Sequence, residues 1–204
     1  MPDLRRHDRA GAAVLMGIEV RAFGETDVVV AAGLTRSGEE GSAVFSADLA
    51  CRYALTRKWA DTTLHLCPVV IMLNPSTADA DTDDATVRKV RSLLRRDGHG
   101  GMVVVNLFGY RTRSPAKLLR QPDAEGEANA RVVRRVIGGV LPGVPVVAAW
   151  GAYGSVPRVG RLAGRLAGDL AGQPLWCWGT TRAGDPRHPL YLPGKTPLVR
   201  WREP

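Results

Sequence analysis

Three polar residues that can take part in chemistry stand within or after short apolar runs. Asn74 directly follows the run at 69–73, and Asn106 lies inside the run at 102–108, while His188 follows a later run after a loop. An amide side chain offers hydrogen-bond donors and an acceptor, and an imidazole can donate a hydrogen bond while it is neutral. A buried amide also needs polar partners. These residues therefore indicate a site that binds a polar ligand.

An acidic segment, ADADTDD, closely follows Asn74 and contains Asp79, Asp81, Asp83 and Asp84. A carboxylate there could stabilise a positive charge or accept a proton, and proximity favours Asp84 and Asp83 for this role. Two other interpretations remain open. Asp81 or Asp83 could cap a following helix. The alternating acids could also hold a divalent cation, although the glycine and the distal glutamate of a calcium loop are absent.

The cysteines and histidines show no pattern for a metal or a cofactor. Cys51, Cys67 and Cys177 lie far apart, and the four histidines have no metal-binding spacing. Structural zinc sites and iron–sulfur sites need clustered ligands. We therefore expect no metal, no cofactor, and reduced thiols in place of disulfides.

Apolar runs separated by amphipathic segments predict the elements that position these residues. Short continuous apolar runs are typical of buried strands, which we expect at 69–73, 102–108, 144–150 and 175–178. Helices are expected at 84–96, 124–141 and 156–171. Strands alternating with helices predict an α/β fold, a three-layer α/β/α sandwich with a mostly parallel four-stranded central sheet. In such sheets, ligands bind at the carboxyl ends of the strands.

The sequence before these runs is less regular. A strand is possible at 28–32, and 45–59 is expected to be extended structure with a turn. We expect a variable N-terminal extension at 1–42 and the α/β/α domain at 43–204. The longest apolar runs are too short to span a bilayer. No signal peptide is recognisable, so we expect a cytoplasmic protein with no membrane partner and no obligate protein partner.

The basic charge lies in the second of these two parts. The 204 residues include 28 Lys+Arg and 20 Asp+Glu, a net charge of +8. Residues 1–42 carry a net charge of −2 and residues 43–204 carry +10. Nearly all the basic residues are arginines, which suit phosphate groups. The charge therefore indicates either a phosphate-bearing partner or an arginine-rich solvated surface.

Four motifs carry a resemblance to a known family. They are IMLNPSTAD, VVVNLFGYR, VVAAWGA and RHPLYLP. Together they are similar to the bacterial family called domain of unknown function 1643, over about residues 43–204. Their order also resembles, more distantly, the uracil-DNA glycosylase superfamily, which implies a uracil-DNA glycosylase-like fold.

The distant resemblance implies catalytic and DNA-binding roles for individual residues. Asn74 would position the attacking water, and His188 would face the leaving base. For a reaction of this kind, Asp84 or Asp83, chosen by proximity alone, could stabilise the sugar cation. The base would be bound by Asn106, Ser76 and Pro75. Gly151 matches the end of the third strand, and Leu192 matches the side chain that wedges into the DNA stack. Basic residues in the neighbouring loops are expected to contact phosphates, namely Arg111, Arg113, Arg187 and Lys195.

The resemblance therefore implies a monofunctional DNA N-glycosidase, a hydrolase that removes a damaged or modified base in base excision. Three residues depart from the superfamily pattern. Asn74 replaces the strong catalytic aspartate of the uracil branch, Leu190 replaces the serine after His-Pro, and Ser76 replaces the tyrosine that screens out thymine. Two alternatives stay open, the same reaction on free nucleotides or nucleosides and a non-catalytic nucleic-acid-binding module. The expected partner is accordingly DNA, single- or double-stranded, or a nucleotide.

Overall fold

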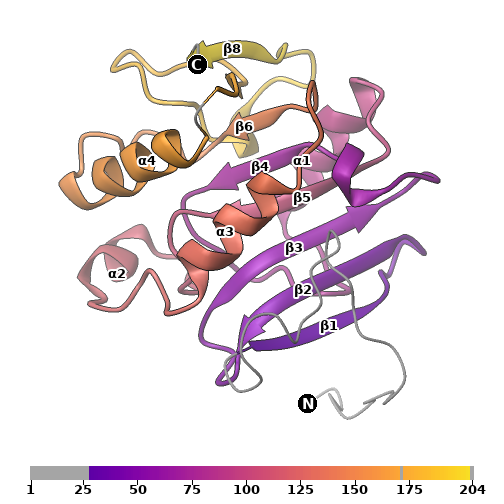
Figure 1. Cartoon of the computed structure of the whole chain (residues 1–204), viewed down its shortest axis with the longest axis horizontal. Coiled ribbons are helices and arrows are strands. Elements are labelled where there is room, and N and C mark those ends of the chain that lie inside the picture. Colours follow the sequence, from indigo (N-terminus) through magenta and orange to yellow (C-terminus); the bar gives the residue numbers. More distant parts are fainter. Residues whose placement is uncertain (1–27, 171, 203–204) are drawn as a thin grey trace.

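A computed structural model describes residues 28–170 and 172–202, which form one eight-stranded sheet. The strand order is β1-β2-β3-β5-β4-β6-β7-β8, and Figure 1 shows it running from β1 at the lower edge to β8 at the upper edge. The strands are β1 (Val28–Leu34), β2 (Glu40–Ser46), β3 (Arg52–Lys58), β4 (Val69–Met72), β5 (Gly101–Asn106), β6 (Val146–Ala148), β7 (Leu175–Cys177) and β8 (Val199–Arg202).

The prediction of a mostly parallel four-stranded sheet is wrong. Strands β5, β4, β6 and β7 pair in parallel, but the other four of the seven neighbouring pairs are antiparallel. Strands β1 and β3 lie in the stretches expected as a possible strand at 28–32 and as extended structure at 45–59, whereas β2 and β8 were not predicted. None of the four was placed in the central sheet, because their apolar patterns are interrupted. Strand β3 carries Arg52, Thr56 and Arg57 as buried residues, and β8 alternates apolar and charged residues. A search for continuous apolar runs finds only strands whose two faces are both apolar.

The expected N-terminal extension lies partly in this sheet. Residues 1–27 are outside the described residues. Residues 28–42 include β1 and the first residues of β2; β1 pairs with β2, and β2 pairs with β3. The described part of the segment therefore belongs to the same sheet as the domain.

Helices cover both faces of the sheet. They are α1 (Ala85–Arg96), α2 (Pro115–Arg120), α3 (Asn129–Gly138) and α4 (Pro157–Asp169), with the short 3-10 helices η2 (Leu64–Leu66) and η3 (Pro189–Tyr191). Helices α3 and α4 lie in front of the sheet in Figure 1 and pack on one core cluster. Helix α1 packs on the opposite cluster through Val87, Val90, Leu93 and Leu94.

The pairing of the strands brings three chain segments together at one edge of the sheet, the one where the parallel strands β4 and β5 have their carboxyl ends. Met72 at the end of β4 lies opposite Asn106 at the end of the parallel strand β5. Strand β3 runs antiparallel to β5, so its first residue, Arg52, lies at the same edge. The N-terminus of α1 follows β4 through the acidic segment.

In the part of the chain that the structure describes, no helix is long and apolar enough to cross a membrane.

Candidate functional site

A cavity of about 450 Å³ lies at this edge of the sheet. Its size falls in the range typical of small-molecule sites, about 300–1,000 Å³. Many of the residues predicted from the sequence line it: Asn74, Ser76, Asp84, Asn106, Arg113, Gly151 and His188. The sequence did not indicate several others, among them Arg52, Thr86, Trp150, Tyr153 and Tyr191. The cavity therefore joins residues from 52 to 191 along the chain.

The amide of Asn74 has a defined orientation. Its Nδ2 donates to the carbonyl oxygens of Pro75, at 2.9 Å, and Thr112, at 2.8 Å. Two carbonyl acceptors on one side assign the nitrogen to that side. The oxygen Oδ1 therefore points away from these carbonyls and is an acceptor that can orient a water or a ligand N–H group. Pro75 itself is buried, and its carbonyl also accepts from the backbone of Thr112.

Asn106 is the most deeply buried polar residue of the cavity. Its side chain lies on the same face of β5 as those of Met102 and Val104, so it points toward the α1 face. The residue is 1% exposed, and neither Nδ2 nor Oδ1 has a hydrogen-bond partner among the described residues. Burying an amide without hydrogen-bond partners lowers the stability of a protein by about 1–3 kcal/mol. The Asn106 amide therefore indicates a polar ligand that offers both a donor and an acceptor.

His188 is the N-cap residue of the 3-10 helix η3, and its imidazole ring is held in one tautomer. Its Nδ1 accepts from the backbone N–H of Leu190, at 3.4 Å, so the neutral ring carries its proton on Nε2. Burial lowers the pKa of His188 below its ordinary value, and the negative charge of Asp84 acts in the opposite direction. The ring is therefore neutral near pH 7 and donates from Nε2.

Gly151 lies directly beside His188. Its φ is +82°, in the left-handed region that favours glycine. A Cβ at this position would lie 3.3 Å from the Cβ of His188. The backbone N–H of Gly151 also donates to the carbonyl of Pro186, at 3.0 Å. The glycine therefore lets the loop after β6 and the loop that carries His188 approach each other.

The two favoured aspartates separate in the structure. Asp84 caps α1, since its Oδ1 accepts from the N–H of Val87 at 2.9 Å, and it also lines the cavity. Asp83 is buried away from the cavity, where its carboxylate pairs with Arg57 at 2.8 Å and Arg91 at 3.1 Å. Capping was predicted for Asp81 or Asp83, but Asp84 does it. Of the two, Asp84 alone can face a ligand in the cavity.

Arg52 is the charged residue among the cavity residues that the sequence did not indicate. It is 2% exposed, and its Nη1 donates to the carbonyl of Ala78 in the acidic segment. Burial lowers the pKa of Arg52 to about 10, so the group stays charged at neutral pH. A signal was present in the sequence, because a charged residue within a strand core needs a partner as much as Asn106 does.

The residues predicted to contact DNA lie in different places. Arg113 lines the cavity, whereas Arg187 and Lys195 are exposed outside its lining. Arg111 lies beside a neighbouring hollow, with its guanidinium 5.1 Å from the ring centre of Phe45. Leu192 is 4% exposed and packs in the core cluster of α1. A side chain in that position cannot enter a DNA stack without leaving the core.

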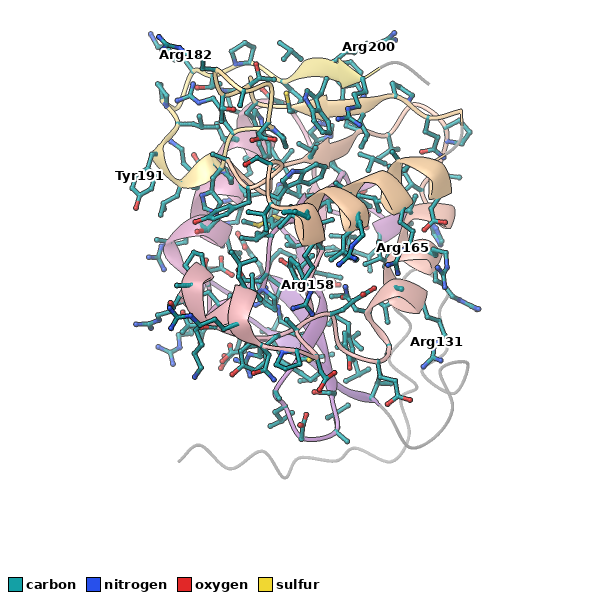
Figure 2. All side chains as sticks on the ribbon, turned by 90° about the vertical axis from the view of Figure 1, so that its left-hand side faces the viewer. Arg131, Arg158, Arg165, Arg182, Tyr191 and Arg200 are labelled. Carbon is teal, nitrogen blue, oxygen red and sulfur yellow. The ribbon has the colours of Figure 1, made fainter. Side chains whose placement is uncertain are left out.

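Tyr191, and not its neighbour Leu192, is the exposed residue of the two. Its side chain is 85% exposed and it lines the mouth of the cavity. Figure 2 shows Tyr191 projecting away from the body of the molecule. The one-residue difference changes which side chain of the RHPLYLP segment meets solvent.

Metal binding has no site in the described residues. Within 28–170 and 172–202, no group of three or more histidine, cysteine or acidic residues could hold a metal ion. The three cysteines are free and buried, and burial raises the pKa of each thiol. The cavity lining itself offers amide, imidazole, carboxylate and guanidinium groups.

Comparisons with known proteins assign the chain to a family. No curated protein and no solved structure matches the chain. These comparisons add no support for the uracil-DNA glycosylase resemblance, which rests on four short motifs. The family model described as "Protein of unknown function (DUF1643)" matches residues 52–190, a range that includes strands β3 to β7 and all the cavity residues named above except Tyr191. The chain therefore belongs to the DUF1643 family.

Proposed function

We propose that this protein is a monofunctional N-glycosidase that removes a damaged or modified base from DNA by hydrolysing its N-glycosidic bond. One observation carries the proposal: the unpaired, buried amide of Asn106 faces a cavity that also contains the neutral His188 and the carboxylate of Asp84. An amide in such a site can read the donor–acceptor edge of a base. Enzymes that act on bases in DNA commonly bind the base in a pocket of this kind after it leaves the stack.

The proposed reaction breaks the C1′–N bond, and the electron pair leaves with the base. The sugar becomes cation-like, and water then adds to C1′ and releases a proton. Nε2–H of His188 donates to an oxygen of the departing base and stabilises its negative charge. Asn74 Oδ1 accepts a hydrogen bond from the water and orients it. Because the transition state is dissociative, an amide in place of a carboxylate is sufficient for this step.

Asp84 is the negatively charged group of the proposed site. Its Oδ1 holds the helix cap, and Oδ2 takes no part in that cap. A carboxylate in this position stabilises the positive charge of the sugar and can accept the proton of the water. The cap also limits the motion of the carboxylate, so its charge stays at the cavity wall.

The surface around the cavity supports DNA as the substrate. Tyr191 offers an exposed aromatic ring at the cavity mouth, and stacking of a base on such a ring is typically worth about 1–3 kcal/mol. Arg113 lies in the cavity lining, and Arg187 and Lys195 are exposed on either side of the segment that carries His188 and Tyr191, where they can contact phosphates.

The proposal is tested by mass-spectrometric detection of free base. The full chain is incubated with single- and double-stranded oligonucleotides that each contain one modified base. We expect release from at least one oligonucleotide, and a decrease of about 100-fold or more in Asn74→Ala and His188→Ala. Arg161→Gln, which changes an exposed arginine of α4, is the matched control and should keep the wild-type rate. Release that is unchanged in both cavity variants would refute the assignment.

A second candidate is the same reaction on a free nucleotide or nucleoside. The cavity volume of about 450 Å³ suits one nucleoside, and the buried cation Arg52 suits an anionic small molecule. Salt distinguishes the two candidates. Binding of DNA weakens steeply with rising salt because phosphate contacts release counterions, whereas binding of a nucleoside does not. Base release from nucleosides alone would favour the second candidate.

A further inference from the structure

Arg52 is a buried cation without a counter-ion. It is 2% exposed, yet no carboxylate oxygen lies within 4.0 Å of its nitrogens in the described parts of the chain. Its Nη1 donates to the carbonyl of Ala78, and its Nε has no hydrogen-bond partner there. Buried charges are normally paired, because removing an ion from water is costly. The charge of Arg52 is therefore left to be compensated by something in the cavity.

Arg57 on the same strand shows the usual arrangement. Its side chain is fully buried, and its Nε pairs with Oδ1 of Asp83 at 2.8 Å. The rest of its guanidinium donates to backbone carbonyls, those of Thr56 at 2.7 Å and Asp79 at 2.6 Å. Two buried arginines of one strand thus differ: Arg57 forms an ion pair with Asp83, whereas Arg52 forms no ion pair with any residue that the structure describes.

The surroundings of Arg52 favour a negative group. Burial and the positive charges of Arg111 and Arg57 disfavour its own charge, and Asp84 and Asp79 compensate only in part. The N-terminal turn of α1 also reaches the cavity through Thr86 and Val87. The partial positive charge of a helix N-terminus attracts anions. Asp84 is the opposing negative charge in this wall, and its Oδ1 is occupied by the N–H of Val87.

Arg52 and Asn106 belong to adjacent strands and line the same cavity. The Nε and Nη2 atoms of a guanidinium lie on one side of the group and form a fork that fits two oxygens of an oxyanion. Nη1 of Arg52 lies outside this fork, so its bond to Ala78 leaves the fork intact. The Asn106 amide beside it can bind a second polar group of the same ligand.

We propose that Arg52 forms an oxyanion subsite in this cavity, and that the ligand presents an oxyanion to its Nε–Nη2 edge. The inference rests on the proposed function for the nature of the ligand, which is a base or a nucleotide. The oxyanion is then either the phosphate of a nucleotide or an ionised oxygen of the base. In the second case, the same guanidinium stabilises the charge that the base carries when the C1′–N bond breaks.

The test is isothermal titration of the full chain with four probes at low salt. The probes are inorganic phosphate, a nucleoside 5′-monophosphate, the parent nucleoside, and a pyrimidine carboxylate that is anionic at neutral pH. We expect at least one anionic probe to bind and the neutral nucleoside to bind more weakly. Arg52→Gln should weaken anion binding about 10- to 100-fold, as expected for charge-assisted hydrogen bonds. Arg52→Lys keeps the charge but not the fork, so its affinity for the anion should lie between those of the wild type and Arg52→Gln.

Arg161→Gln, the control on α4, should bind every probe as the wild type does. Binding of phosphate and the monophosphate only would identify phosphate as the oxyanion, and binding of the carboxylate only would identify the base. Equal anion binding by the wild type and Arg52→Gln, or no anion binding at all, would refute the subsite.

Asn106→Asp provides a second test if the Arg52 variants fail to fold. A carboxylate on the neighbouring strand should pair with Arg52 and exclude the anion, so anion binding should fall further than in Asn106→Ala. Equal losses in the two variants would argue against the subsite. Base release is measured separately. Arg52-dependent anion binding without base release refutes the N-glycosidase alone, and base release without Arg52-dependent binding refutes the subsite alone.

Discussion

Arg57 on β3 and Asp83, the residue before the helix cap Asp84, form a buried ion pair in which Nε lies 2.8 Å from Oδ1. The same guanidinium donates to the carbonyl of Asp79, so one side chain holds both ends of the acidic segment. This pair places Asp84 at the cavity wall, although neither Arg57 nor Asp83 lines the cavity.

Removing this pair should destabilise the protein. Arg57→Met leaves Asp83 buried with Arg91 as its remaining partner, and breaking a buried pair typically costs about 3–5 kcal/mol. Urea unfolding followed by circular dichroism measures the change. Lys58→Met is the control, since its pair with Glu40 is more exposed and should be worth less than about 1 kcal/mol. Equal effects of the two substitutions would contradict the structural role of Arg57.

Introducing a carboxylate at position 74 should not increase base release. In Asn74→Asp, one oxygen would face the carbonyls of Pro75 and Thr112, which now accept from Nδ2. Facing acceptors repel each other, so we expect a loss of stability of about 1–3 kcal/mol and no gain in base release. Thermal unfolding and the base-release assay measure both. A faster and equally stable variant would show that the amide orientation is wrong.

Acid should weaken the folded state through His188. Burial lowers its pKa in the folded protein below the ordinary value of 6.5, so the unfolded chain binds more protons between the two values. Stability from this group is therefore complete above about pH 6.5 and decreases as the pH falls below that value. Urea unfolding measured from about pH 5 to about pH 7.5, where histidine titrates, should show this decrease in the free energy of unfolding.

His188→Gln should flatten that pH dependence. His99 also has a pKa lowered by burial, so part of the slope should remain and should disappear in the double variant with His99→Gln. A slope that is unchanged in His188→Gln would mean that His188 does not lose its charge on folding.

Gly151 should tolerate alanine less well than a glycine with the same backbone. Gly151→Ala adds left-handed strain, typically about 1–2 kcal/mol, and also places a methyl group 3.3 Å from the Cβ of His188. Gly143 is the matched control, because its φ is +86° and a Cβ there meets nothing within 4 Å. Both variants should lose stability, but only Gly151→Ala should also slow base release. A similar rate of base release in the two variants would show that Gly151 has no role in the site.

Tyr191 and Leu192 should have opposite effects although they are neighbours. Tyr191→Ala should change stability by less than about 0.5 kcal/mol, because the ring is 85% exposed. It should weaken oligonucleotide binding about 5- to 100-fold through lost stacking, as measured by fluorescence anisotropy. Leu192→Ala should cost about 2–5 kcal/mol as a core truncation. Weaker oligonucleotide binding in a stable Leu192→Ala protein, with Tyr191→Ala unchanged, would reverse the assignment.

The sequence alone determined the central elements and seven of the cavity residues. The four apolar runs correspond to β4, β5, β6 and β7, and the amphipathic segments correspond to α1, α3 and α4. These elements are visible locally, because burial on both faces requires a continuous apolar run and burial on one helix face requires a 3.6-residue period. Asn74, Asn106 and His188 could be selected for the same reason, since they follow or interrupt apolar runs whose ends meet at one edge of a sheet.

The tertiary structure decided what depends on pairing between distant segments. Four antiparallel pairings enlarge the sheet, and the pairing of β3 with β5 brings Arg52 to the cavity. Neighbouring residues can point in opposite directions, which is why Asp84 faces the cavity while Asp83 is paired elsewhere, and why Tyr191 is exposed while Leu192 is buried. Such choices follow from the packing of whole elements, which contacts between neighbouring residues do not determine.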